Sequence, residues 1–86
     1  MRIYVRNLST EVTEEELRRE FRAFGEVTSV IIVKNRYDGS SRGFGFVEML
    51  RTPEGQAAIT NLNGKVLKKG LIFCNAIQDW SDFGGT

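Results

Sequence analysis

Residues 42–49 read Arg-Gly-Phe-Gly-Phe-Val-Glu-Met, and their large side chains alternate. In an extended strand, Phe44 and Phe46 share one face, and Val47 and Met49 share the other. A sheet in a domain of this size packs one face against a core, so one of these two sets has to be turned away from it. The rest of the chain indicates which face is buried.

Outward from this strand, the chain alternates between strand and helix patterns. Strands are expected at residues 2–6, 27–34 and 71–76, because these segments alternate or are rich in β-branched residues. A first helix is expected after Thr13, which forms a capping box with Glu16, and Gly25 suits its C-terminal end. A second is expected with Thr52 as N-cap and Pro53 at its first position, ending at Asn63-Gly64.

The order strand, helix, strand, strand, helix, strand predicts a fold of the α+β class. It matches the ferredoxin-like split βαβ plan (βαββαβ), a four-stranded antiparallel sheet with two helices on one face. The helices are expected to cover an aliphatic face, which carries Ile3, Val5, Val30, Ile32, Val47, Ile72 and Cys74. No further element remains to cover the opposite face, so that face is expected to be exposed to solvent.

The composition restricts the function classes. The 86 residues predict one domain, residues 1–78, followed by a tail at residues 79–86. One cysteine and no histidine exclude a disulfide, a cysteine-cluster zinc site and a histidine-based triad, so we expect no catalytic residues, metal or cofactor. The longest apolar run, residues 30–33, predicts no membrane span. We expect a soluble monomer in the cytoplasm, or in the nucleus if the source is eukaryotic.

The net charge of +1, from 12 basic and 11 acidic residues, argues weakly against a nucleic-acid-binding domain. The side chains of the exposed sheet face argue the other way, because aromatic residues with Ile31 and Val33 beside them form a contiguous patch there. The aromatic set is Tyr4, Phe44, Phe46 and Phe73. The basic residues on or beside the same face are Arg2, Arg6, Lys34 and Arg42.

Three interpretations of this patch are open. In the first, the two faces of the sheet are reversed and the aromatic rings form the core. In the second, the patch is a protein interface. In the third, it is a platform on which single-stranded nucleic acid stacks. Stacking needs flat accessible rings, and phosphates need nearby guanidinium or ammonium groups. The combination of rings and basic residues favours the third interpretation.

Residues 42–49 resemble the octapeptide of the RNA recognition motif family, K/R-G-F/Y-G/A-F-V-x-F/Y, at seven positions. Met49 departs from the pattern at a position that faces the core. Residues 3–8, Ile-Tyr-Val-Arg-Asn-Leu, are similar to the hexapeptide of the same family. The resemblance covers residues 2–77, and the short form is most similar to the small bacterial and cyanobacterial members.

The resemblance implies a non-catalytic domain that binds single-stranded RNA, with single-stranded DNA as a further candidate ligand. Tyr4 and Phe46 would each stack on a base, Phe44 would contact sugars, and Arg42 would pair with a phosphate. Two residues at the end of the last strand, Asn75 and Gln78, would hydrogen-bond to base edges.

Several residues keep two interpretations. Glu48 either accepts a hydrogen bond from a base amino group or pairs with a nearby arginine. Phe73, where the family has a polar or basic residue, either extends the stacking surface or packs under the tail. In the tail, Trp80 either covers a core edge or lies over the sheet. The hypothesis is that Trp80 or Phe83 lies over part of the sheet when no ligand is bound. Acidic residues such as Asp79 indicate a modest affinity.

Two rival functions remain on the same fold. A protein-binding domain would not need the three aromatic residues of the motifs. A small acyl-phosphate hydrolase would need an arginine and a positioning asparagine, and Arg6-Asn7 matches this requirement only weakly. A lysine run at residues 65–69 is expected to be a solvated loop, with phosphates beyond the sheet as its alternative contact, and Cys74 is expected to be a buried, unreactive thiol.

Overall fold

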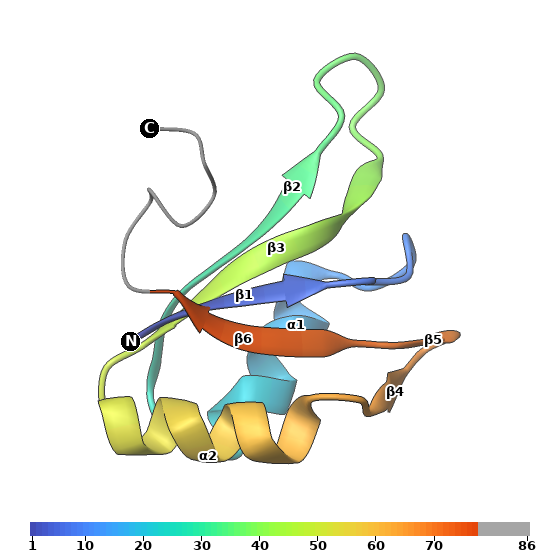
Figure 1. Cartoon of the computed structure of the whole chain (residues 1–86). Coiled ribbons are helices and arrows are strands. Elements are labelled where there is room, and N and C mark those ends of the chain that lie inside the picture. Colours follow the sequence, from blue (N-terminus) through green and yellow to red (C-terminus); the bar gives the residue numbers. More distant parts are fainter. Residues whose placement is uncertain (78–86) are drawn as a thin grey trace.

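A computed structural model describes residues 1–77 of the chain. Eight elements follow one another: β1 (Arg2–Arg6), α1 (Glu14–Arg22), β2 (Val27–Lys34), β3 (Ser41–Met49), α2 (Thr52–Leu62), β4 (Val66–Leu67), β5 (Gly70–Leu71) and β6 (Phe73–Ile77). The main sheet is antiparallel, with the strand order β2-β3-β1-β6, and both helices lie on one side of it (Figure 1). The predicted βαββαβ architecture is confirmed.

The central strand β1 fixes the register of the sheet. Tyr4 lies opposite Phe46 of β3 on one side and opposite Asn75 of β6 on the other. On the other face of the sheet, Ile3 lies opposite Val47. This pairing places the two aromatic-bearing motifs on adjacent strands.

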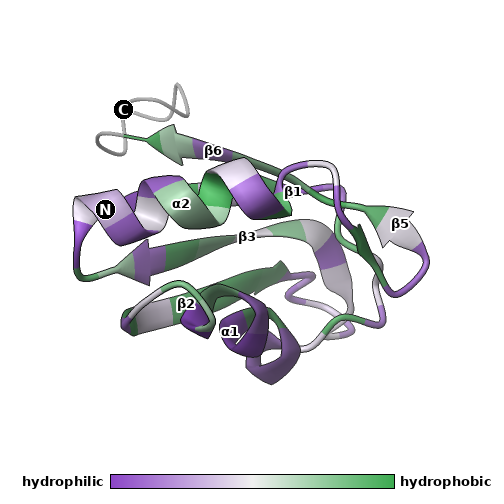
Figure 2. Ribbon diagram, turned by 90° about the horizontal axis from the view of Figure 1, so that it is seen from below, coloured by the Kyte–Doolittle hydropathy of each residue, from purple (hydrophilic) through white to green (hydrophobic). Residues whose placement is uncertain are grey.

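The core lies between the sheet and the helices (Figure 2), and it is built from the aliphatic face. Leu17 and Phe21 of α1 and Ala58 and Leu62 of α2 are buried against it. The core residues that the sheet contributes are Ile3, Val5, Ile32, Val47, Met49 and Cys74. The interpretation in which the two faces are reversed is therefore wrong, and the aromatic residues lie on the side away from the helices.

Helix α1 begins as the sequence predicts. The Glu16 backbone N–H donates to the Thr13 hydroxyl at 3.1 Å, and the Thr13 N–H donates to the Glu16 carboxylate at 3.0 Å. Its end differs, because the C-cap is Ala23 and not Gly25. Gly25 is required by packing, since a Cβ there would overlap with the side chain of Glu54.

Two further boundaries differ from the predictions. The N-cap of α2 is Arg51, and Thr52 is its first helical residue. The last strand of the sheet begins at Phe73, because Leu71 pairs with Val66 in a small hairpin instead. Ile72 separates the hairpin from β6, and its N–H donates to the Lys65 carbonyl at 2.9 Å.

Candidate nucleic-acid interface

Three aromatic rings meet at the centre of the exposed sheet face. The rings of Tyr4 and Phe46 are stacked, with centroids 5.7 Å apart and planes 28° from parallel. Phe44 meets both edge-on, at 6.0 Å from Tyr4 and 6.3 Å from Phe46. We call Tyr4, Phe44 and Phe46 the aromatic triad. All three side chains are half-buried and lie on the side opposite the helices.

A glycine between the two phenylalanines allows this arrangement. Gly45 lies opposite Val5 of β1 and Ile32 of β2, on the buried face of β3. A Cβ at this position would collide with the backbone carbonyl of Ile31. Gly45 thus lets β2 approach β3 closely beside it in the sheet, while Phe44 and Phe46 on either side of it point away from the core.

Basic side chains lie on or at the ends of the strands that carry the triad and on the neighbouring strand β2. Arg6, Lys34 and Arg42 are exposed, and within residues 1–77 the structure places no carboxylate at ion-pair distance from any of them. Arg2 pairs with Glu48 at 3.9 Å. Arg2 and Arg6 lie on β1 opposite Glu48 and Phe44, on the face of the rings. Lys34 instead lines a hollow with Ile32 and Glu14, on the side of helix α1.

Phe73 lies on this surface and contacts Arg6, a pairing that the sequence did not indicate. It lies opposite Arg6 in the sheet, and the Arg6 guanidinium covers its ring at 4.9 Å from the centroid. A guanidinium plane held on a ring is itself a surface on which a base can stack. Packing of Phe73 under the tail would involve residues outside the described part of the chain.

The polar residues predicted to contact base edges divide into two groups. Asn75 is exposed and lies opposite Tyr4, beside the triad. Glu48 lies in line with Phe46 on the same face of β3. Gln78 and the tail residues Trp80 and Phe83 lie outside the described residues, so their predicted roles stay predictions.

Although the net charge is near zero, many of the acidic residues lie away from the sheet that carries the triad. Each lysine of the 65–69 run pairs with an acid in or just before α1, and all three stay exposed as the sequence predicts. The pairs are Lys65–Glu20 at 2.9 Å, Lys68–Glu16 at 2.9 Å and Lys69–Glu11 at 3.0 Å. The Lys68 ammonium, with the Thr13 backbone next in importance, lowers the pKa of Glu16. These acids are paired away from the triad, whereas within residues 1–77 no carboxylate lies at ion-pair distance from Arg6 or Arg42.

The loop between β2 and β3 projects beyond the sheet (Figure 1) and has its own hydrogen bonds. The Tyr37 N–H donates to the Asn35 side chain at 2.8 Å, and the Ser40 N–H donates to Asp38 at 2.9 Å. The bond from Ser40 lowers the pKa of Asp38. Tyr37 is 90% exposed, with the Arg36 guanidinium 5.9 Å from its ring. The pair adds an exposed ring and a cation to the loop between β2 and β3.

The structure offers little to the hydrolase alternative. The side-chain amide of Asn7 donates to the Leu71 carbonyl at 2.7 Å, so it ties the end of β1 to β5 and does not position a water. Among residues 1–77, no group of three acidic, cysteine or histidine side chains could hold a metal ion. None of the described helices is long and apolar enough to cross a membrane.

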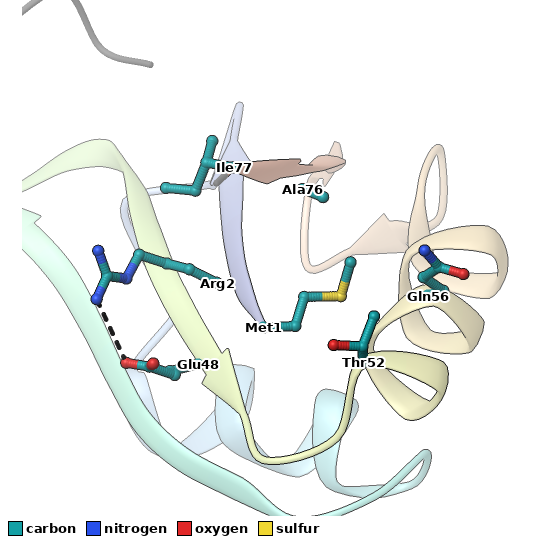
Figure 3. Close-up of a pocket in the computed structure, with 7 residues that line it drawn as sticks. All are labelled: Met1, Arg2, Glu48, Thr52, Gln56, Ala76 and Ile77. Atoms are coloured by element: carbon teal, nitrogen blue, oxygen red, sulfur yellow. Dashed lines mark ion pairs between the residues drawn. The ribbon is translucent and has the colours of Figure 1, made fainter. Parts of the chain in front are cut away.

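A groove of about 710 Å³ lies at one end of the sheet (Figure 3). Its walls come from the start of β1, the end of β3, the first turns of α2 and the end of β6. The residues that line it are Met1, Arg2, Glu48, Thr52, Gln56, Ala76 and Ile77. None of the triad residues lines it, so this groove and the aromatic platform are separate features that share the Arg2–Glu48 pair.

A four-stranded sheet with helices behind it, and with accessible rings and basic residues in front, is the arrangement of a small nucleic-acid-binding domain. Residues 3–72 match the family model of the RNA recognition motif, and the chain belongs to this family. The resemblance seen in residues 3–8 and 42–49 is thereby confirmed.

Known proteins of several kinds are similar to the chain. Polyadenylate-binding protein 5 of Arabidopsis thaliana is 32% identical over 80 residues, which cover 93% of this chain and 12% of that protein. Glycine-rich RNA-binding protein 1 of Mycosarcoma maydis is 42% identical over 66 residues, which cover 77% of this chain and 38% of that protein. The chain therefore spans well under half the length of these curated relatives.

Solved structures share the whole fold. The crystal structure of RNA binding protein PG1 has a TM-score of 0.87 and 36% identity, and the match covers 92% of this chain and 96% of that one. A chain in an Sxl-lethal protein/RNA complex has a TM-score of 0.86 and 27% identity, with 91% of this chain and 47% of that one covered.

Proposed function

We propose that this chain binds single-stranded RNA on its exposed sheet face and that it is not an enzyme. The aromatic triad is the observation that carries the proposal. Three rings in mutual contact, only half-buried and on the same face as the Arg6 guanidinium, have no task in the core, which is built on the other face. Membership of the family and the names of the relatives support the same ligand class.

The three rings differ in orientation, and this suggests different tasks. Tyr4 and Phe46 lie nearly parallel on adjacent strands, so each offers a face to one base of the bound strand. Phe44 stands edge-on to both, which suits contact with the sugars that link those bases. The Arg6 guanidinium, held on Phe73, continues the platform towards β6.

In this proposal, phosphates are held by exposed cations at the ends of the strands. Arg42 and Lys34 lie at the loop end of β3 and β2, and Arg6 lies at the end of β1. About three phosphate contacts correspond to a slope of roughly −2 in log K against log salt for a single strand. Binding therefore depends on stacking more than on charge.

The remaining features of the function are proposals of the same kind. Stacking and phosphate pairing do not read the 2′-hydroxyl, so single-stranded DNA is proposed to bind as well. We also propose that the chain acts as a monomer. A location in the cytoplasm, or in the nucleus of a eukaryote, stays a prediction.

A titration of the chain with short labelled RNAs tests the proposal. Fluorescence anisotropy with a randomised single-stranded octamer should give saturable binding, and the same octamer annealed to its complement should bind much more weakly, because its bases are no longer free to stack. Equal binding to single and double strands, or no binding to either, would contradict the proposal.

A further inference from the structure

One acidic residue lies on the exposed sheet face, which is otherwise suited to an anionic ligand. Within the four strands of the described sheet, Glu48 is the only acidic residue. It lies opposite Arg2 in the register, and the nearest guanidinium and carboxylate atoms are 3.9 Å apart (Figure 3). That distance permits attraction between the charges but is too long for a hydrogen bond.

The Glu48 carboxylate is open to a ligand. Its side chain is 45% exposed, and no donor from residues 1–77 hydrogen-bonds to its carboxylate. An ionised carboxylate only accepts hydrogen bonds, so a ligand group that meets it has to be a donor. Phosphates have no donor, whereas the ribose 2′-hydroxyl and the edges of the bases do. Only the base edges differ from one nucleotide to another.

A small hollow lies between this acid and the aromatic triad. Its volume is about 60 Å³, roughly twice the share of one water molecule in the liquid. The residues that line it are Arg2, Ser29, Ile31, Phe46, Val47 and Glu48. Because Phe46 and Glu48 both line it, the hollow can receive the edge of a base whose plane is stacked on Phe46.

The four bases present different edges to this hollow. On its Watson–Crick edge, guanine has two adjacent donors, N1–H and N2–H, and a carbonyl oxygen beside them. A carboxylate accepts both donors at once, and an arginine beside it suits the carbonyl. Cytosine and adenine offer the carboxylate one amino group each. Uracil offers one N–H between two carbonyl oxygens, which a carboxylate repels.

We propose that Arg2 and Glu48 together read the edge of the base stacked on Phe46 and select guanine there. This inference rests on the proposed binding of RNA. The carboxylate of Glu48 accepts from N1–H and N2–H, and the guanidinium of Arg2 donates to O6. Cytosine and adenine rank next, and uracil ranks last.

The test compares five-residue RNAs of uridine that carry G, C, A or U at the centre, by fluorescence anisotropy at one salt concentration. The native chain should bind the guanosine RNA about five- to tenfold more tightly than the all-uridine RNA. Glu48→Gln should reduce this ratio to about twofold or less, because an amide offers one acceptor where the carboxylate offers two. Affinity for the all-uridine RNA should stay the same or rise.

A matched variant separates base reading from simple charge. Glu26→Gln removes one exposed acid from the turn after α1, away from the sheet face, and should leave the ratio between the RNAs unchanged. If Glu48→Gln strengthens binding of all four RNAs equally, Glu48 acts only through its charge and the inference is wrong. A native chain that binds all four equally also overturns it, while the proposed function stands. Failure to bind any RNA would overturn the proposed function itself.

Discussion

Replacing Phe46 by alanine is expected to weaken RNA binding while the domain stays folded. Phe46 contacts both other rings of the triad and carries one base of the bound strand in the proposed mode. Stacking of one base on an aromatic side chain contributes about 1–3 kcal/mol, which corresponds to roughly a five- to 150-fold change in Kd. Tyr4 and Phe44 remain, so the variant should still bind.

The expected loss of stability is smaller than for a core residue. A fully buried phenylalanine costs about 3–5 kcal/mol on truncation to alanine, and Phe46 is half-buried. A loss of about 2 kcal/mol leaves a domain of ordinary stability, about 5–15 kcal/mol, largely folded. Circular dichroism should therefore show a lower Tm with the native spectrum retained at 25 °C.

Phe46→Leu provides the matched control for this experiment. Leucine keeps apolar cover over the sheet but has no flat ring, so its Tm should lie closer to that of the native chain. Its loss of RNA affinity in the same anisotropy titration should approach that of Phe46→Ala. The reasoning is refuted if Kd is unchanged in Phe46→Ala, or if Phe46→Leu binds RNA as well as the native chain does.

Three further predictions address other parts of the structure. Arg6→Lys keeps the charge but loses the guanidinium plane that covers Phe73. It should therefore weaken binding of a six-nucleotide RNA several-fold more than binding of a three-nucleotide RNA. An equal effect on both lengths would contradict a stacking role for Arg6. Burial raises the pKa of Cys74 to about 11, so the contribution of its protonated thiol to stability is complete below pH 9 and is lost as the pH rises to about 11. Iodoacetamide at pH 8 should therefore react slowly with the native chain and quickly with the chain in urea. Equal rates would show that the thiol is accessible in the native chain. Because the pKa of Glu16 is lowered, its pairing with Lys68 stabilises the fold at pH values above the ordinary glutamate pKa of 4.5, and this stabilisation is lost as the pH falls below it. A Lys68→Met variant should lose less stability on acidification than the native chain, as urea titrations at several pH values would show.

The sequence predicted the fold well because its patterns are local and mutually consistent. The bounds predicted for β1 and β2 agree with the structure, and the capping box at Thr13 sets the start of α1. The exposed face was predictable because Phe44 and Phe46 alternate with Gly45 and Val47 along one strand. Alternation alone decides such a face once the helices are known to cover the other.

Contacts between distant segments could not be predicted in the same way. The lysine run gave no sign that it would pair with acids some 45 to 60 residues earlier, because the register of a loop against a helix depends on the tertiary fold. The position of Arg6 over Phe73 depends on the pairing of the first and last strands. Gly25 resembled a helix cap in sequence, and only the packing of Glu54 against it explains the glycine.

The most direct test of the proposed interface is a ¹H–¹⁵N correlation spectrum of the chain recorded during titration with a single-stranded RNA. The account predicts the largest shifts at the amides of β1 and β3, around Tyr4, Phe44 and Phe46, with smaller shifts at Arg6 and Phe73. The outward faces of α1 and α2 should change little. Shifts concentrated on the helices, or a spectrum unchanged at a large excess of RNA, would contradict the assignment of the sheet face as the RNA-binding surface.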